Sequence, residues 1–206
     1  MPKPKYNHPF IKFVRHECRR YKVKFMLQHE NEIKNQDEGA LSCGGYFTDT
    51  PAELAVATRI SYTDFLSTLV HEYSHMTQWI DNSPYYIGHR GFDSWDIIER
   101  WINGEDFTRS TIRKSINIVR DCELDCDRRA VELIKKFRIP INIDRYCRKS
   151  SAYIYFHNFM KITRRWEYKE MPSNKYQIIN KMPTNLNGDY SRTPRKIMAL
   201  FKKYMH

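Results

Sequence analysis

The stretch from residue 109 to residue 137 carries the longest uninterrupted helical pattern of the chain. Its apolar positions recur in steps of three and four, the period of an α-helix, at Ile112, Ile116, Val119, Cys126, Ala130, Leu133 and Phe137. One position of this stripe, residue 123, holds Glu instead of an apolar side chain. Because a desolvated carboxylate without a partner is costly, the stripe predicts that Glu123 meets a cation in the core. The alternative is a partly exposed Glu123 paired with Arg120, Arg128 or Arg129.

A second segment, residues 69–79, suggests that this cation is a divalent metal ion. The stretch LVHEYSHMTQW at residues 69–79 places His71 and His75 four residues apart. In a helix such side chains project from one face with Cβ atoms about 5–6 Å apart, so both rings could bind one zinc ion. Glu72 lies beside the first histidine, where it could take a proton from a water molecule on the metal. The alternative is a pair of ordinary histidines at the surface or at the core edge.

The order of these motifs resembles the gluzincin branch of the zincin metallopeptidases, in which H-E-x-x-H on one helix is followed by E-x-x-x-D on a later helix. The resemblance implies His71, His75 and Glu123 as ligands of one Zn²⁺ and Glu72 as the general base. It also implies that Asp127 accepts a hydrogen bond from a ligand histidine and holds its tautomer.

The spacing departs from the thermolysin-like pattern, in which the E-x-x-x-D follows the histidines much sooner. Here 47 residues intervene, so residues 81–108 are expected to form an insertion that could cap the cleft. The segments CELDCDRRAVELIKKF, SSAYIYFHNFMKITRRW and NKMPTNL also resemble uncharacterised metallopeptidases of tailed bacteriophages, over roughly residues 60–186.

Two rival sets of ligands remain open. His89, fourteen residues after His75, resembles the third histidine of the SprT-type metalloproteases, although Arg90 interrupts the expected H-G pair. With His89 as the ligand, Glu123 would lack a buried partner. Cys122 and Cys126, also four residues apart, could bind a metal as thiolates, or they could be buried for packing alone.

Peptide hydrolysis by zinc also needs a donor for the developing oxyanion. Tyr153, Tyr155 and His157 are candidates for this donor, and core packing is the alternative for each of them. The strand expected at residues 53–58 resembles the cleft-edge strand that pairs with extended substrate in zincins. The alternative is an ordinary inner strand.

The expected elements describe an α+β fold, in which strands come first and helices follow. Alternation of polar and apolar residues predicts a strand at 21–28 and a pair of strands within 44–60, turned at Asp49-Thr50-Pro51. Helices are expected at about 61–80, with Ser61 and Asp64 as a capping box, and at the ranges 94–104, 107–137, 143–168 and 194–204. Residues 1–170 are expected to form a zincin-like domain with a small antiparallel or mixed sheet, and residues 171–206 a basic extension packed on the same domain.

Positive charge is concentrated in the last third of the chain. Residues 1–137 hold 20 Lys and Arg against 20 Asp and Glu, whereas residues 138–206 hold 15 basic and 4 acidic residues. Aromatic residues are interleaved with this charge, so nucleic acid or another polyanion is a possible partner. The alternative is a solvated basic face that aids solubility.

The N-terminal sequence MPKPKYNHPFIKF lacks the apolar run of a signal peptide, and no stretch is long and apolar enough for a transmembrane segment. Five cysteines without a repeated spacing fit reduced thiols. A cytoplasmic location is therefore expected, in the host cell if a phage encodes the chain.

The function expected from these residues is a zinc-dependent metallopeptidase that cleaves protein or peptide substrates. One alternative is a SprT-like, nucleic-acid-associated protease with His89 as the third ligand. The other is a non-catalytic nucleic-acid-binding protein in which zinc only stabilises the fold.

Overall fold

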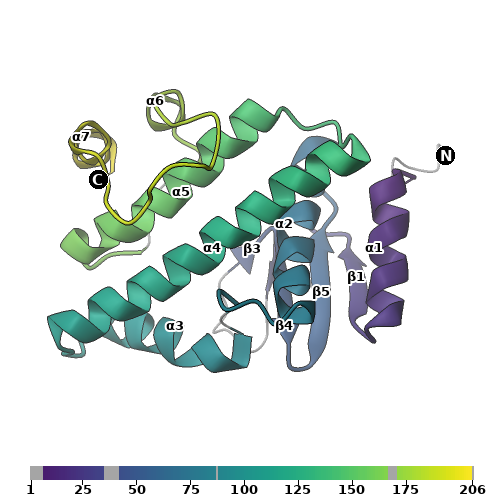
Figure 1. Ribbon diagram of the computed structural model, residues 1–206, viewed down its shortest axis with the longest axis horizontal. Coiled ribbons are helices and arrows are strands. Elements are labelled where there is room, and N and C mark those ends of the chain that lie inside the picture. Colours follow the sequence, from purple (N-terminus) through teal and green to yellow (C-terminus); the bar gives the residue numbers. More distant parts are fainter. Residues whose placement is uncertain (1–6, 35–41, 87, 167–170, 206) are drawn as a thin grey trace. The chain divides into compact units, whose positions relative to one another are not determined.

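The structure belongs to the α+β class that the sequence predicts. This computed structural model describes residues 7–34, 42–86, 88–166 and 171–205. Small sheets are formed by residues 24–57, and helices make up most of the remainder (Figure 1). The chain divides into unit 1, Met1–Pro84 with Arg129–Ile141, and unit 2, Tyr85–Arg128 with Asn142–His206. No helix within the described ranges has the length and hydrophobicity needed to cross a membrane.

The main sheet of unit 1 has three strands. Strand β5 (Ala52–Ala57) lies in the middle, parallel to β1 (Lys24–Gln28) and antiparallel to β4 (Gly45–Asp49). The turn between β4 and β5 contains a cis peptide bond before Pro51, at the predicted place. Since β5 is bonded on both sides, the interpretation of residues 53–58 as a cleft-edge strand is wrong. Parallel pairing with β1, a contact distant in sequence, makes it an inner strand.

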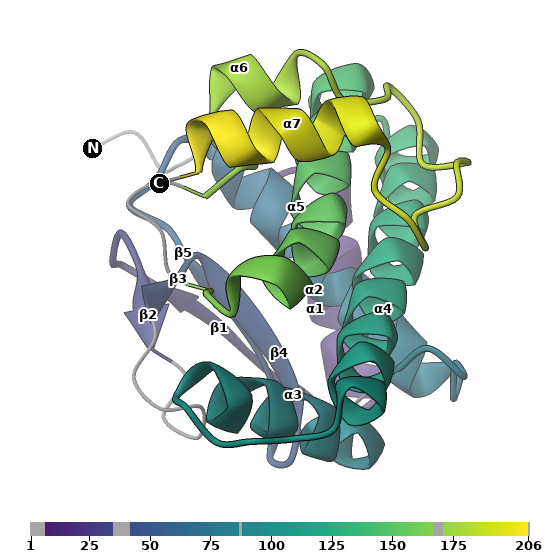
Figure 2. The same ribbon diagram turned by 90° about the vertical axis from the view of Figure 1, so that its left-hand side faces the viewer.

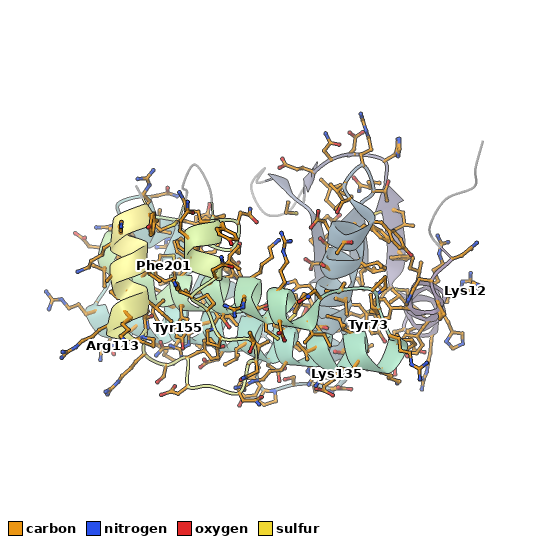
Figure 3. All side chains as sticks on the ribbon, turned by 90° about the horizontal axis from the view of Figure 1, so that it is seen from above. Lys12, Tyr73, Arg113, Lys135, Tyr155 and Phe201 are labelled. Carbon is orange, nitrogen blue, oxygen red and sulfur yellow. The ribbon has the colours of Figure 1, made fainter. Side chains whose placement is uncertain are left out.

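Two helices cover one face of this sheet. Helix α2 (Tyr62–Ile80) begins where the sequence predicts, with the Ser61 hydroxyl accepting a hydrogen bond from the Asp64 amide at 3.1 Å. Helix α1 (Pro9–Arg20) was not predicted, although its buried residues Phe10, Ile11, Val14 and Cys18 have helical spacing. The two helices meet where Tyr73 of α2, labelled in Figure 3, packs edge-on against Phe10 at 5.8 Å between ring centroids.

A short antiparallel pair, β2 (Ile33–Lys34) and β3 (Ser42–Cys43), packs on the opposite face of the sheet. Side chains alternate between the faces of a strand, so Ala55 and Ala57 contact Ile33 while Leu54 and Val56 face the helices. The sheet is thus covered on both sides, which explains why all four of these β5 residues are fully buried.

Unit 2 is helical. It holds α3 (Gly88–Ile102), α5 (Ile143–Thr163) and the first twenty residues of α4 (Arg109–Phe137), whose remainder continues into unit 1. The predicted stripe of α4 is buried here, and it forms a core with neighbouring helices through Ile98, Ile112, Ile116, Val119 and Met160. Helix α3 starts earlier than the predicted residue 94. Ser94 is therefore a buried residue inside the helix and does not cap it.

The basic C-terminal segment packs against α5. Helices α6 (Tyr176–Ile179) and α7 (Arg195–Tyr204) contact α5, and α7 crosses it (Figures 1 and 2). The rings of Phe159 and Phe201 are 5.4 Å apart, and the Tyr190 and Ser151 hydroxyls are hydrogen-bonded at 2.7 Å. The Arg148 guanidinium donates to two carbonyls of the segment, those of Asn180 and Met182.

Candidate metal centre

The two histidines of the H-E-x-x-H motif face each other on α2. The ring centroids of His71 and His75 are 4.8 Å apart and their planes are perpendicular. Both side chains are half-buried. One helical turn therefore brings two imidazoles close enough to bind a single ion, as the i, i+4 spacing predicts.

Gln78 orients the second of these rings. Its Oε1 lies 2.9 Å from Nδ1 of His75, and the Gln78 side chain is fully buried. An amide oxygen can only accept, so this contact requires a proton on Nδ1 and leaves the Nε2 lone pair available for a metal. Gln78 was not among the residues predicted from the sequence, although its position three residues after His75 on the same helix is a usable signal.

Glu72 lies over the beginning of strand β4. A Cβ atom added to Gly45 would stand 3.2 Å from Cγ of Glu72 and 2.7 Å from Cγ2 of Thr68. The helix therefore approaches the strand so closely that only glycine fits there. This close contact between α2 and β4 sets the distance of the half-buried Glu72 from the sheet.

Cys126 of α4 is a further side chain with a metal-binding atom. Cys126 is fully buried on α4, less than one turn before Arg129. Arg129 itself is bound to the end of α2, donating to Asp81 at 2.7 Å. Nitrogen and thiolate sulfur are ligands that suit zinc.

Glu123 is buried, with 8 % of its surface exposed. The alternative of a partly exposed Glu123 therefore does not hold. Two of the arginines proposed as its partners also bind elsewhere, since Arg120 pairs with Asp121 and Arg128 donates to the Leu186 carbonyl. The role of Glu123 as a metal ligand stays a prediction.

Asp127 is also buried, as a residue supporting a metal site should be. Its Oδ1 accepts a short hydrogen bond, 2.6 Å, from the hydroxyl of the buried Tyr146. Tyr146 was not singled out in the sequence. The predicted hydrogen bond between Asp127 and a ligand histidine remains untested.

His157 of α5 is completely buried among aromatic rings, with Tyr153 at 4.9 Å and Trp166 at 5.7 Å between centroids. Its Nδ1 lies 3.0 Å from the Tyr153 carbonyl oxygen, which requires the proton on that nitrogen. Burial lowers the pKa of His157, and the nearby Glu123 carboxylate opposes this only in part. The ring is thus neutral near pH 7, and Nε2 has no hydrogen-bond partner among the described residues.

This tautomer bears on the predicted oxyanion donor. A neutral ring protonated on Nδ1 offers a lone pair at Nε2, so His157 can accept a hydrogen bond or bind a metal there. Donation from Nε2 would need the protonated ring, which burial disfavours. Tyr153 and Tyr155 keep hydroxyl donors, although Tyr155 packs on Tyr190 with ring centroids 4.6 Å apart.

His89 falls in the first turn of α3, but its side chain lies outside the described residues. The segment expected as an insertion, residues 81–108, contains α3 and the loop that follows it. Its proposed role as a cap stays a prediction.

Comparisons with known protein families, with curated proteins and with solved structures found no match for this chain. The candidate centre is therefore interpreted from its own residues. These are the His71 and His75 pair and the adjacent Glu72.

Proposed function

We propose that the chain is a zincin-like, zinc-dependent metallopeptidase. The observation that carries the proposal is the pair of imidazoles 4.8 Å apart on α2, with Glu72 adjacent in the same helix. Two ligands and a carboxylate base from one helix form the core of a hydrolytic zinc site.

The third protein ligand in this proposal comes from α4. Glu123 is the preferred candidate, since a carboxylate buried in an apolar helix face is best explained by a cation. Cys126, three residues later on the same helix face, is its competitor because it is a fully buried cysteine whose thiolate could bind zinc. Zinc accepts either a carboxylate oxygen or a thiolate sulfur beside two imidazoles.

A zinc ion bound here would supply Lewis acidity, polarising the substrate carbonyl and making water a nucleophile near neutral pH. Glu72 would take the proton from that water and deliver it to the leaving amine. Gln78 would hold His75 in the tautomer that presents Nε2. In this scheme Glu72 is the only residue of α2 that transfers a proton.

Substrate would bind along β4. This strand is an edge of the three-stranded sheet, and α2 packs against it at Gly45 and Phe47. An extended peptide can add to such an edge through main-chain hydrogen bonds. The scissile bond would then lie beside Glu72, which stands over the start of the strand. In this proposal β4, and not β5, pairs with extended substrate.

The proposal is tested by the variant Glu72→Gln. We expect the variant to retain zinc and to lose roughly 10²- to 10⁴-fold of peptidase activity, the usual contribution of a general base. Zinc content is measured by metal analysis, and activity by digestion of a broad peptide library with and without chelator. Glu99→Gln, an exposed residue of α3 with the same loss of charge, is the matched control.

The competing function is a zinc-stabilised, nucleic-acid-binding protein without catalysis. It predicts no chelator-sensitive cleavage by the wild-type chain and identical behaviour of Glu72→Gln in every assay. Either result would refute the peptidase proposal.

A further inference from the structure

A cavity of about 400 Å³ opens in unit 2. It lies where the end of α3, the loop after it, the first turns of α4 and the end of α5 come together. Its apolar wall consists of Trp101, Phe107 and Ile112. Its charged wall consists of four cations and no acid: Arg109, Arg113, Lys161 and Arg164.

The positive charge of this cavity is largely uncompensated. Arg109 and Arg113 are exposed, and neither has an ion-pair partner within the described residues. Lys161 donates to the side-chain oxygens of Asn117 at 2.7 Å and Asn158 at 2.9 Å, which are both neutral. Among the residues that line the cavity, no acidic side chain therefore offsets the charge of the four cations.

Arg164 is held in place by the backbone of the α3–α4 connection. It donates to the carbonyls of Trp101 at 2.5 Å and Glu105 at 2.7 Å, and its guanidinium lies over the Trp101 ring. The acids of this loop contribute little, because the Glu105 carboxylate is bound to Arg100 and the fully exposed Asp106 is 3.9 Å from Arg164. The cavity is thus a preformed site for a negative group.

The environment of Lys161 supports the same reading. Burial, and then repulsion by Arg120 and Arg113, lower its pKa to about 8, while Asp121 opposes the shift. An anion placed among these cations would relieve the repulsion. The N-terminus of α4 adds the partial positive charge of the helix dipole. This terminus is at Thr108, whose hydroxyl accepts a hydrogen bond from the Thr111 amide at 3.1 Å.

We propose that this cavity binds one nucleotide unit, with the phosphate at the Arg109, Arg113 and Lys161 side and the base against the wall formed by Trp101 and Phe107. Its volume falls in the range of sites for ligands of this size. Arginine matches phosphate oxygens in geometry and charge. The guanidinium groups of Arg164 and Arg100 already cover one face of the Trp101 and Phe107 rings, so the base packs against the part of these rings that lines the cavity. The nucleotide could be free or part of a single strand, and both sources present the same chemistry. The inference does not depend on the peptidase proposal.

The test is competition against a fluorescently labelled oligothymidylate, read as fluorescence anisotropy on the full-length protein. The competitors are inorganic phosphate, adenosine monophosphate and an unlabelled oligonucleotide. We expect the Arg109→Ala, Arg113→Ala double variant to lose at least about tenfold in affinity, since two charge-assisted contacts are removed. The matched control is the Lys12→Ala, Arg19→Ala double variant, which removes the same charge from exposed positions of α1, outside the basic C-terminal third, and should bind within about twofold of wild type.

The outcomes separate the parts of the proposal. Competition by adenosine monophosphate assigns the cavity to a free nucleotide, and competition by the oligonucleotide alone assigns it to a strand. A Phe107→Ala variant should weaken binding of the nucleotide but not of inorganic phosphate, and inorganic phosphate competing as well as the nucleotide would overturn the base contact. No binding of any probe, or equal losses in the two double variants, would overturn the proposal.

Discussion

Nδ1 of His75 lies 2.9 Å from the side-chain oxygen of Gln78, and the ring of His75 lies 4.8 Å from that of His71. Both contacts are within α2, since His71 precedes His75 by about one turn and Gln78 follows it by about one turn. Because the buried Gln78 amide holds the His75 ring at Nδ1, the second ring nitrogen, Nε2, points in a defined direction. The geometry of the pair is therefore set by interactions that are local to α2.

Replacing Gln78 should lower the affinity for zinc without removing the site. We expect Gln78→Leu, which loses the acceptor for the His75 proton, to bind zinc about 10- to 100-fold more weakly, as is common when such a partner is lost. Gln78→Glu restores an acceptor and should recover most of the affinity. Titration with a competing chelator measures both variants, and equal zinc affinity in Gln78→Leu and wild type would show that Gln78 does not orient a ligand.

The third ligand is identified by zinc content. We expect Glu123→Ala to release most of the zinc, while Cys126→Ser and His89→Ala retain about one ion per chain. Retention by Glu123→Ala together with loss by Cys126→Ser would make the sulfur the ligand. Loss by His89→Ala would favour the SprT-like alternative. Circular dichroism of each variant separates lost metal from lost fold.

Gly45 should be intolerant of even a methyl group. An added Cβ would stand 2.8 Å from the Ala55 carbonyl oxygen and 2.7 Å from Cγ2 of Thr68, so strand and helix must separate. We expect Gly45→Ala to cost about 1–3 kcal/mol of unfolding free energy, the usual cost of overpacking. Gly188→Ala is the control, because its nearest neighbour, Tyr190, lies at an ordinary contact distance of 3.8 Å. Equal denaturation midpoints for the two variants would contradict the close packing.

The buried His157 should make stability depend on pH. Its folded-state pKa is lowered, chiefly by burial, from the ordinary value of 6.5. The unfolded chain therefore binds a proton first as the pH falls below about 6.5, and stability decreases until the folded state is also protonated. We expect this histidine to contribute a slope of about 1.4 kcal/mol per pH unit in that window. Urea denaturation of the metal-free protein between pH 7 and pH 5 measures it, and a slope unchanged in His157→Gln would assign the effect to other groups.

Much of the helical structure follows from the sequence because it depends on neighbours within one or two turns. The capping box of Ser61 and Asp64 fixes the start of α2, and the i, i+4 spacing brings His71 and His75 together. The apolar stripe of α4 likewise predicts that Glu123 is buried. Helix α1 was not predicted, because burial of its short apolar face depends on a distant contact, that of Phe10 with Tyr73 of α2.

Contacts distant in sequence could not be predicted in this way. The inner position of β5 depends on its parallel pairing with β1, and nothing in the β5 sequence specifies that partner. The cation-lined cavity likewise depends on Arg109 and Lys161, which are separated by 52 positions and come together only in the folded unit. The sequence by itself determined the start of α2, the buried stripe of α4 and the histidine pair, because hydrogen bonds and side-chain contacts within a helix are local. The tertiary structure decided strand order, the close approach at Gly45 and the cavity, because these arise from packing between distant segments.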